Sequence, residues 1–433
     1  MKETDKTFTI EEVFRSRALE LVNLRGWISS RSDVGNLLFA TLRDGTGYIQ
    51  IAGKRGVALD EAIDEMKKAT VESSVSLSGV VKEDKRAPGG KEVQISSFRI
   101  VAPAEKWPIT KTAVKSRSFL YDNRHLSIRG RKSIAIMRIR ARIIHAAFSF
   151  FGKNGFTLIS APTLVQSASE GGSTLFSLDY FGKKAFLTQS SQLYEEAAIC
   201  SFEKVFIFQP AFRAEKSRTS KHLTEFWMIE AEQAFASQED NLELQERFLS
   251  AVLKEVIESS RAELETLGRQ FAPSNPPYER VSYNDVWRMA TERGIAFEWG
   301  NDLPTEVERM ISNDMQGPFF ITDYPSASRG FYHMLKEDDE RLTLSADLIA
   351  PEGFGEIATG GERIYDAKLL AKRVKDQDIP LESLKWYMDL RHYGLPPHSG
   401  FGIGVERTVR WVCGLENIRA ASLFPRTTTR ISP

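Results

Sequence analysis

The sequence predicts an α/β protein of several domains, in which a small β-barrel precedes a larger domain of mixed helices and strands. Two observations carry this prediction. Apolar residues alternate in short runs from Ala18 to Val101, a pattern typical of half-buried strands. From Ile134 onward, apolar residues recur with helical spacing over longer segments. A chain of 433 residues is long enough for two or three domains.

Five alternating runs make up the predicted barrel, which we place at residues 1–103. They are LVNLRGWIS, LLFATLRD, GYIQIAG, VSLSGVV and EVQISSFRIV, separated by Gly, Asp and Lys turns. One helical insert is predicted among them, at about Leu59 to Ala69. Five strands with one helix suit an oligonucleotide-binding (OB) barrel, whose face presents side chains to single-stranded bases.

Residues 104–130 form the predicted hinge, because prolines and a polar stretch follow the barrel there. The larger domain is predicted over residues 131–433. We expect it to open with a core helix, Ile134 to Phe151, and a strand that ends at Pro162. Further on, we expect a second amphipathic helix and an insertion of small helices, at Glu239 to Leu267 and at residues 282–317.

The composition sets limits on the partners and the compartment. Lys plus Arg equals Asp plus Glu at 58 each, so any contact with nucleic acid must come from local patches. Cys200 and Cys413 lie far apart and without metal-ligand spacing, which predicts a reducing, cytoplasmic compartment. The sequence has no signal core and no run of about 18 apolar residues. No membrane association is expected.

Two motifs carry the predicted chemistry. Phe212 to Glu232, FRAEKSRTSKHLTEFWMIEAE, has Arg-x-Glu, a polar loop and then His-x-x-x-Phe, and Gly400 to Arg407 reads GFGIGVER. Together they can place cations over phosphates and an aromatic face under a purine. Alone, Arg-x-Glu is usually a solvated ion pair, and spaced glycines also mark bulges. The order and pairing of the two motifs favour an adenylate-forming ATP site.

On these motifs the chain resembles the class II aminoacyl-tRNA synthetases, and within them the aspartyl and asparaginyl subgroup. Further shared segments are YDNRHLSIR (121–129), SEGGSTLF (169–176), DYFGKKAFLTQSSQLY (179–194) and NIRAASLFPR (417–426). The resemblance implies an N-terminal OB-fold anticodon-binding domain and a catalytic domain with an antiparallel sheet flanked by helices. It also implies a homodimer.

The resemblance assigns roles to residues of this chain. Arg213 and Arg407 would be catalytic, and ATP would contact Arg213, Glu215, His222, Phe226, Glu356, Gly404 and Arg407. Mg²⁺ would be held by Asp347, Glu356 and Thr359, whose hard oxygen atoms suit that ion, although two acids in a loop are more often solvated. The amino acid would contact Glu170, Ser190, Gln192, Glu196 and Arg363. The anticodon would contact Arg31, Phe39 and Gln50, although Phe39 could equally be a core residue of the barrel.

Within the subgroup, the sequence is closest to the asparaginyl enzymes. Aspartyl enzymes have a lysine at the position of Glu195, so this pocket carries an acid where aspartate would need a cation. A like charge about 4 Å away costs on the order of 4 kcal/mol at an effective dielectric near 20, whereas a carboxylate can accept from a carboxamide NH₂. We expect Glu196 to read that amide. Lys221, Gly330 and Glu362 depart from the pattern of the subgroup.

The predicted reaction is therefore ATP-dependent activation of L-asparagine and its transfer to the 3′ end of tRNA(Asn). The alternatives are an aspartyl enzyme, strict or relaxed, a relative that activates amino acids without charging tRNA, and a non-catalytic RNA-binding relative. The retained barrel argues against the second alternative. The retained phosphate-binding arginines argue against the third.

Overall fold

The computed structural model describes residues 7–433 except 36, 57, 167–174, 217–218, 220 and 273. The chain divides into two compact units, residues 1–121 and 122–433. This boundary falls inside the predicted hinge. The hinge contains two short helices, α3 (Arg117–Asp122) and α4 (Arg124–Ser127).

The first unit is a closed five-stranded barrel in the order β1-β2-β3-β5-β4, as predicted. The strands are β1 (Leu21–Val34), β2 (Leu37–Arg43), β3 (Tyr48–Lys54), β4 (Ser74–Glu83) and β5 (Lys91–Ala102). Alternate side chains of each strand fill the barrel core. The predicted insert is helix α2 (Asp60–Lys68). A second helix, α1 (Ile10–Arg15), was not predicted; Thr9 and Glu12 form a capping box at its start.

The second unit is built on an eight-stranded sheet in the order β12-β13-β14-β15-β16-β11-β10-β6. All neighbours are antiparallel except the pairs β6–β10 and β12–β13. The strands are β6 (Thr157–Leu158), β10 (Lys204–Phe212), β11 (Glu225–Ala234), β12 (Glu279–Ser282), β13 (Phe319–Thr322), β14 (Ser345–Ala350), β15 (Gly355–Glu362) and β16 (His398–Gly404). The predicted antiparallel sheet is confirmed.

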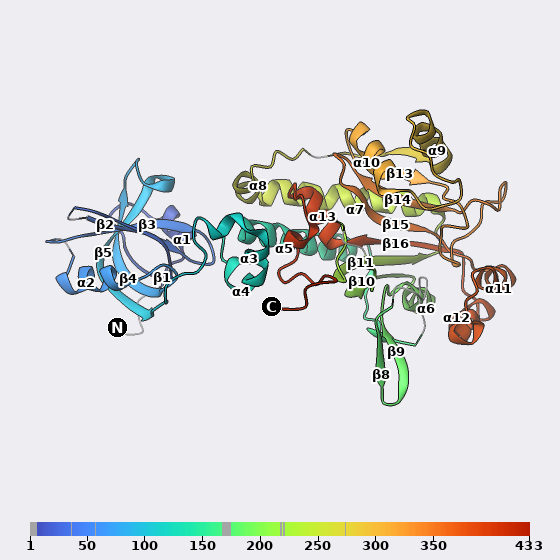
Figure 1. Cartoon of the computed structure of the whole chain (residues 1–433), viewed down its shortest axis with the longest axis horizontal. Coiled ribbons are helices and arrows are strands. Elements are labelled where there is room, and N and C mark those ends of the chain that lie inside the picture. The colour runs from blue at the N-terminus through green and yellow to red at the C-terminus, as the bar shows by residue number, and fades with distance from the viewer. Residues whose placement is uncertain are drawn as a thin grey trace. The chain divides into compact units, whose positions relative to one another are not determined.

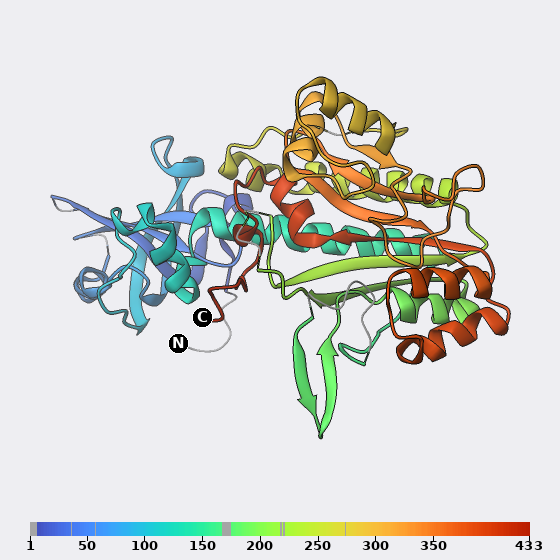
Figure 2. The same cartoon turned by 45° about the vertical axis from the view of Figure 1, so that its right-hand side comes forward.

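Two long helices, α5 (Arg131–Lys153) and α7 (Gln238–Ser259), run along one face of this sheet (Figures 1 and 2). On α5, the buried residues Ile136, Ile139, Ile143 and Ala147 recur every three or four positions and enter the main core. The helix ends just before Gly155, which takes a left-handed conformation (φ 79°) that residues other than glycine rarely adopt. The opposite face of the sheet is left for the functional site.

Two predicted elements differ from the structure. The strand expected to reach Pro162 pairs with β10 only at Thr157 and Leu158, so the paired strand β6 is shorter than predicted. The helix expected over Glu239 to Leu267 is interrupted at Ser260, where α8 (Arg261–Leu267) begins.

The insertion of small helices is present as α9 (Tyr283–Glu292) and α10 (Thr305–Asp314), between β12 and β13. Val307 and Ile311 anchor α10 in a core shared with Tyr283 and Phe319.

The remaining elements surround the sheet. They are a three-stranded sheet of β7 (Leu164–Val165), β8 (Ser177–Tyr180) and β9 (Lys183–Leu187), and helices α6 (Gln192–Phe202), α11 (Ala367–Asp376), α12 (Lys385–Asp389) and α13 (Val405–Val412). In the part of the chain described, no helix is both long and apolar enough to span a membrane.

Candidate active site

Strand β11 lines the whole length of the site with one of its faces. Because side chains alternate along a strand, Phe226, Met228, Glu230 and Glu232 share a face. Phe226 and Met228 line one pocket, and Met228, Glu230 and Glu232 line a second. The two pockets share Arg213, Met228, Thr359 and Gly402. They are therefore two halves of one continuous site.

The glycines of the GFGIG motif clear the space above β11. Strand β16 pairs Gly400 with Glu232 and Gly402 with Glu230. A Cβ atom at Gly400 would lie 1.8 Å from Oε2 of Glu232, and one at Gly402 would lie 2.9 Å from Cε of Met228. Any larger residue would collide with the side chains that line the site. The glycine spacing is thus required by the pocket itself.

The first pocket has a volume of about 580 Å³ and contains every residue predicted to contact ATP. Arg213 directly follows β10, and Arg407 is near the start of α13. The guanidinium of Arg213 lies 5.6 Å from the ring centre of Phe226. Arg407 donates to Glu356 at 2.6 Å. The pocket therefore combines two guanidinium groups with an aromatic face, which suits a nucleotide with its phosphates.

His222 adds an imidazole to this pocket. Burial, with the nearby charges of Arg407 and Arg213, lowers the pKa of His222. Its Nδ1 lies 2.5 Å from the hydroxyl oxygen of Thr219, and its Nε2 lies 3.9 Å from Glu215.

Glu406 of the GxGxER motif has a structural role. It is buried, accepts a hydrogen bond from the backbone N–H of Trp227 at 2.9 Å and pairs with Arg140 at 3.0 Å. These contacts tie the start of α13 to β11 and α5. They hold Arg407, the next residue, at the edge of the nucleotide pocket.

The predicted metal ligands lie on the neighbouring strands β14 and β15. Asp347 faces Thr359 across the pair, and the Thr359 hydroxyl donates to Asp347 at 2.5 Å. Arg329 donates to the other oxygen of Asp347, also at 2.5 Å. Glu356 and Thr359 line the nucleotide pocket.

The electrostatics of these acids suit a cation. Burial, together with the charge of Glu356, raises the pKa of Asp347 to about 6 despite the ion pair with Arg329. For Glu356, burial is outweighed by Arg407, which lowers its pKa. Two buried carboxylates that repel each other, one of them hydrogen-bonded to a hydroxyl, offer the hard oxygen atoms that Mg²⁺ prefers.

The second pocket, of about 440 Å³, holds Ser190, Gln192 and Arg363 from the predicted amino-acid site. Ser190 donates to Glu230 at 2.7 Å. Arg363 donates to both oxygens of Glu232, at 3.0 and 3.2 Å. This buried pair places a carboxylate and a guanidinium side by side in the pocket.

Three glutamates crowd this pocket. Glu195 is almost fully buried, and its Oε1 has no hydrogen-bond partner. Burial, followed by the charges of Glu230 and Glu232, raises the pKa of Glu195 well above its ordinary value. Burial likewise raises the pKa of Glu232, even beside Arg363. Burial is the main cause of both shifts, and for Glu195 the neighbouring acids Glu230 and Glu232 add to it. The pocket is therefore acidic, and a further carboxylate would bind poorly here.

The contacts of Glu196 give no support to its predicted role. Glu196 does not line the second pocket. Its Oε2 accepts from Arg391 (2.6 Å), Tyr387 (2.7 Å) and His398 (3.0 Å), and its Oε1 accepts from the amide of Gln192 (3.0 Å). The carboxylate is therefore fully occupied behind the pocket. What it does contact is Gln192, whose amide it orients.

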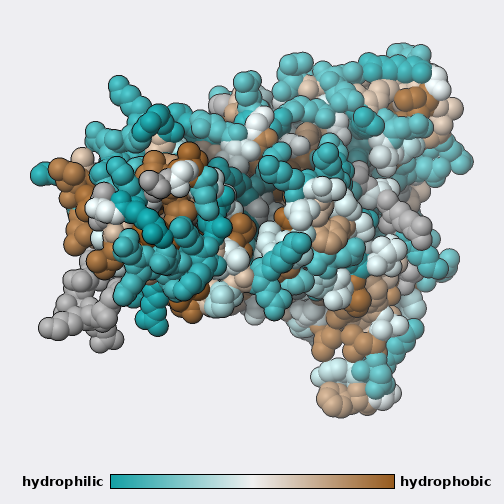
Figure 3. All heavy atoms as spheres, turned by 60° about the vertical axis from the view of Figure 1, so that its left-hand side comes forward, coloured by the Kyte–Doolittle hydropathy of each residue, from teal (hydrophilic) through white to brown (hydrophobic). Residues whose placement is uncertain are grey.

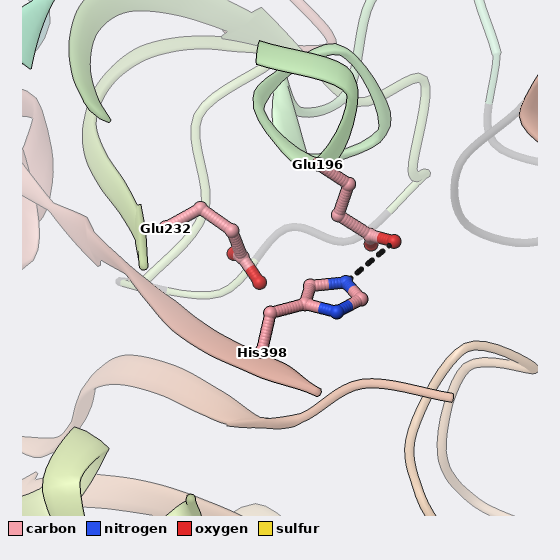
Figure 4. A group of neighbouring side chains, drawn as sticks. All are labelled: Glu196, Glu232 and His398. Atoms are coloured by element: carbon pink, nitrogen blue, oxygen red, sulfur yellow. Dashed lines mark hydrogen bonds and ion pairs between the residues drawn. The ribbon is translucent and has the colours of Figure 1, made fainter. Parts of the chain in front are cut away.

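Figure 4 shows Glu196 on its helix, with the imidazole ring of His398 pointing toward it. Glu232 lies on the other side of that ring. These three buried side chains could by their spacing hold a metal ion. However, Glu196 already accepts from a guanidinium and Glu232 is paired with Arg363, so these cations already neutralise both acids. The group is best described as a buried support for the pocket.

Glu170 lies outside the described residues. Conversely, Glu230 and Glu232 are pocket residues to which the sequence analysis gave no role. The sequence could have indicated both residues, because alternate positions of a strand share a face and Glu230 and Glu232 lie four and six positions after Phe226.

In the barrel, the predicted anticodon residues do not share one face. The register places Phe39 and Gln50 on the outer face, while their neighbours Leu38 and Ile51 are buried in the core. Phe39 is half-buried and outside that core, and the amide of Gln50 donates to Glu92 at 2.8 Å. Arg31 points the other way and donates to the backbone oxygen of Ala69 at 3.1 Å.

Comparison with known families gives the class of protein to which this fold and these two pockets belong. The family described as tRNA synthetases class II (D, K and N) matches residues 116–428. The OB-fold nucleic acid binding domain family matches residues 22–101. The chain belongs to the class II tRNA synthetases of this group.

Individual relatives narrow the subgroup. The chain is 42% identical over 421 residues to an asparagine–tRNA ligase of Desulforamulus reducens, covering 96% of this chain and 97% of the relative. An asparaginyl-tRNA synthetase from Pyrococcus horikoshii, solved in complex with asparaginyl-adenylate, has a TM-score of 0.95 and 40% identity, covering 99% of this chain and 100% of that one. An aspartyl tRNA synthetase from Entamoeba histolytica has a TM-score of 0.87 and 26% identity, covering 100% and 94%. The predicted class and subgroup are confirmed.

Proposed function

We propose that the protein is an asparagine–tRNA ligase, which activates L-asparagine with ATP and transfers it to tRNA(Asn). The observation that carries this proposal is the Glu232–Arg363 pair in the second pocket. A carboxamide can donate from its NH₂ to the carboxylate and accept at its oxygen from the guanidinium. An aspartate carboxylate could use only the guanidinium, and it would meet the crowded acids Glu195 and Glu230.

Activation needs positioning more than proton transfer. A carboxylate oxygen of asparagine attacks the α-phosphorus of ATP, and pyrophosphate leaves, so no side chain has to take a proton. Arg213 lines both pockets, so its guanidinium can contact the α-phosphate and the amino-acid carboxylate together. We assign the β- and γ-phosphates to His222 and Arg407, and the adenine to the face of Phe226.

Mg²⁺ is proposed to bind Asp347, Glu356 and Thr359. When bound, the ion would neutralise phosphate charge. The residues of the chain then act by keeping those oxygen atoms in place, with Arg329 and Arg407 as the second partners of the two acids.

The barrel is proposed to read the anticodon through Phe39 and Gln50, which share its outer face. A base stacked on Phe39 would contribute roughly 1 to 3 kcal/mol. Arg31, held against the end of α2, would have to leave that carbonyl to join them.

A homodimer and a cytoplasmic location complete the proposal. Strand β6 is an edge strand of the eight-stranded sheet as described, with Leu158 51% exposed, and Leu164 nearby in sequence is 46% exposed. The hairpin β8–β9 projects from the domain and carries apolar side chains (Figure 3), including Phe181, which is 91% exposed. A contiguous apolar surface typically marks a protein interface, and we propose that these side chains belong to one. Cys200 and Cys413 are both free thiols, which suits a reducing compartment.

Pyrophosphate exchange into ATP tests the function. We expect exchange with L-asparagine, little with L-aspartate, and charging of tRNA(Asn) in the complete reaction. Equal exchange with both amino acids would exclude asparagine specificity. Exchange without tRNA charging would indicate a relative that only activates amino acids.

A further inference from the structure

The inserted helix α10 reaches the nucleotide pocket through Glu308. Its carboxylate accepts from the ammonium group of Lys221 at 2.9 Å, and Lys221 lines the pocket beside His222 and Arg407. The other carboxylate oxygen of Glu308 accepts from the backbone N–H of Glu356. One side chain of the insertion thus contacts both a cation of the pocket and the backbone of a predicted metal ligand.

This contact is built into the fold. Gly355 has φ 79°, and a Cβ atom there would lie 1.9 Å from Oε1 of Glu308 and 2.9 Å from Nζ of Lys221. Glycine is therefore needed at 355 both for its backbone conformation and for the approach of Glu308.

Helix α10 is also fixed to the same turn at a second point. Ser312, one turn after Glu308, donates to the backbone oxygen of Ala350 at 2.6 Å and accepts from Gly353 at 3.0 Å. Val307 and Ile311 hold the helix in its own core. Glu308 therefore projects from a firmly anchored helix.

An ordinary surface ion pair would not explain this arrangement. The side chains of Lys221 and Glu308 are only 14% and 15% exposed, so solvent screens their attraction little. Glu308 therefore fixes a cation that lines the nucleotide pocket, and cations are what a triphosphate requires.

We propose that Glu308 is a positioning residue for the triphosphate of ATP, which holds the Lys221 ammonium at the phosphate end of the pocket. The proposal rests on the nucleotide-binding role given above and gives the insertion a function. A lysine has a long flexible side chain and is a point donor. A buried carboxylate partner keeps its ammonium in one place, so that less side-chain entropy is lost when phosphate binds.

Binding of two nucleotides to the full-length protein tests the proposal. Glu308→Gln keeps an oxygen for the N–H of Glu356 but removes the charge that holds Lys221. We expect it to weaken a non-hydrolysable ATP analogue about tenfold, the scale of one charge-assisted hydrogen bond. AMP has no β- or γ-phosphate, so its affinity should stay within about twofold. Calorimetry with Mg²⁺ present measures the affinity for the ATP analogue and the affinity for AMP.

Glu306→Gln is the matched control, because it makes the same change on the exposed side of α10 and should alter neither affinity. Lys221→Met should weaken the ATP analogue to a similar extent, and Glu308→Gln should add little in that background. Three results would overturn the proposal: tighter binding of the ATP analogue, an equal loss of affinity for AMP, or additive effects of the two changes.

Two checks keep the proposal separate from other failures. If Glu308→Gln lowers the melting temperature, Lys221→Met with Glu308 intact gives the same comparison of ATP analogue and AMP. Pyrophosphate exchange by the unchanged protein tests the asparagine assignment alone. The nucleotide affinities do not depend on which amino acid is activated.

Discussion

At the scale of single residues, the pocket shows why spacing along a helix was a poor guide to substrate contacts. Glu195 and Glu196 are neighbours on α6, and the sequence placed both on a face with Gln192. The structure directs Glu195 into the pocket and Glu196 into a cluster with Arg391 and His398. Those partners come from segments about 200 residues later, so no local pattern could reveal them.

Replacing Glu232 tests the proposed recognition of the amide. In Glu232→Gln, one of the two acceptor oxygens becomes an NH₂ donor and the charge that pairs with Arg363 is lost. At the same time, one negative charge near an aspartate carboxylate disappears. We expect kcat/KM for asparagine in pyrophosphate exchange to fall about 100-fold, and the preference over aspartate to fall with it. Glu362→Gln, which lies outside the pocket, is the control. An unchanged preference would remove Glu232 from amide recognition.

Replacing Glu196 tests its supporting role. Because Glu196 and Arg391 are fully buried, Glu196→Gln should lower the free energy of unfolding by about 3 kcal/mol, as measured by urea denaturation. The exposed Glu203→Gln at the end of α6 is the control. Normal stability together with a shift toward aspartate would instead restore the role predicted from the sequence.

The same residue predicts a pH dependence. Burial opposes ionisation of Glu196, but Arg391 and His398 outweigh it and lower its pKa below the ordinary 4.5. A depressed carboxyl pKa stabilises the fold above pH 4.5, and this contribution is lost as the pH falls toward the lower folded-state value. Below pH 4.5, the unfolding free energy of the unchanged protein should therefore fall more steeply than that of Glu196→Gln. Parallel curves would contradict this assignment.

At the scale of elements, alternation predicted the barrel strands well, because each strand there has one buried face. The element boundaries of the second unit were predicted less well. The strand predicted up to Pro162 pairs with β10 only at Thr157 and Leu158, and the break between α7 and α8 has no proline or glycine that could have predicted it. By contrast, the roles of β11 and β16 followed from their motifs, because the pocket needs those residues at alternate positions.

The barrel prediction belongs at this scale. Phe39→Ala should weaken the binding of tRNA in the charging reaction by about 1 to 3 kcal/mol, the contribution of one stacked base. Pyrophosphate exchange without tRNA should stay unchanged. Leu38→Ala, its buried neighbour, should instead lower the melting temperature. Loss of stability in Phe39→Ala comparable to that of Leu38→Ala would mean that Phe39 serves the barrel core.

At the scale of the whole molecule, the exposed edge at β6 predicts assembly. Leu158→Asp should place a charge in the proposed interface and shift the protein from dimer to monomer in sedimentation experiments. Leu381 lies outside this edge and is 47% exposed. The variant Leu381→Asp makes the same change there, and that protein should stay dimeric. A dimer that tolerates Leu158→Asp would place the interface away from this edge.

The continuity of the two pockets through Arg213 and Met228 also has a thermodynamic consequence. In the proposed mode of binding, ATP and asparagine share the walls of these pockets, so we expect their binding free energies to be coupled. Whatever factor ATP imposes on the affinity for asparagine, asparagine must impose on the affinity for ATP. Since Arg213 lines both pockets, we expect a change there to alter the binding of both substrates at once.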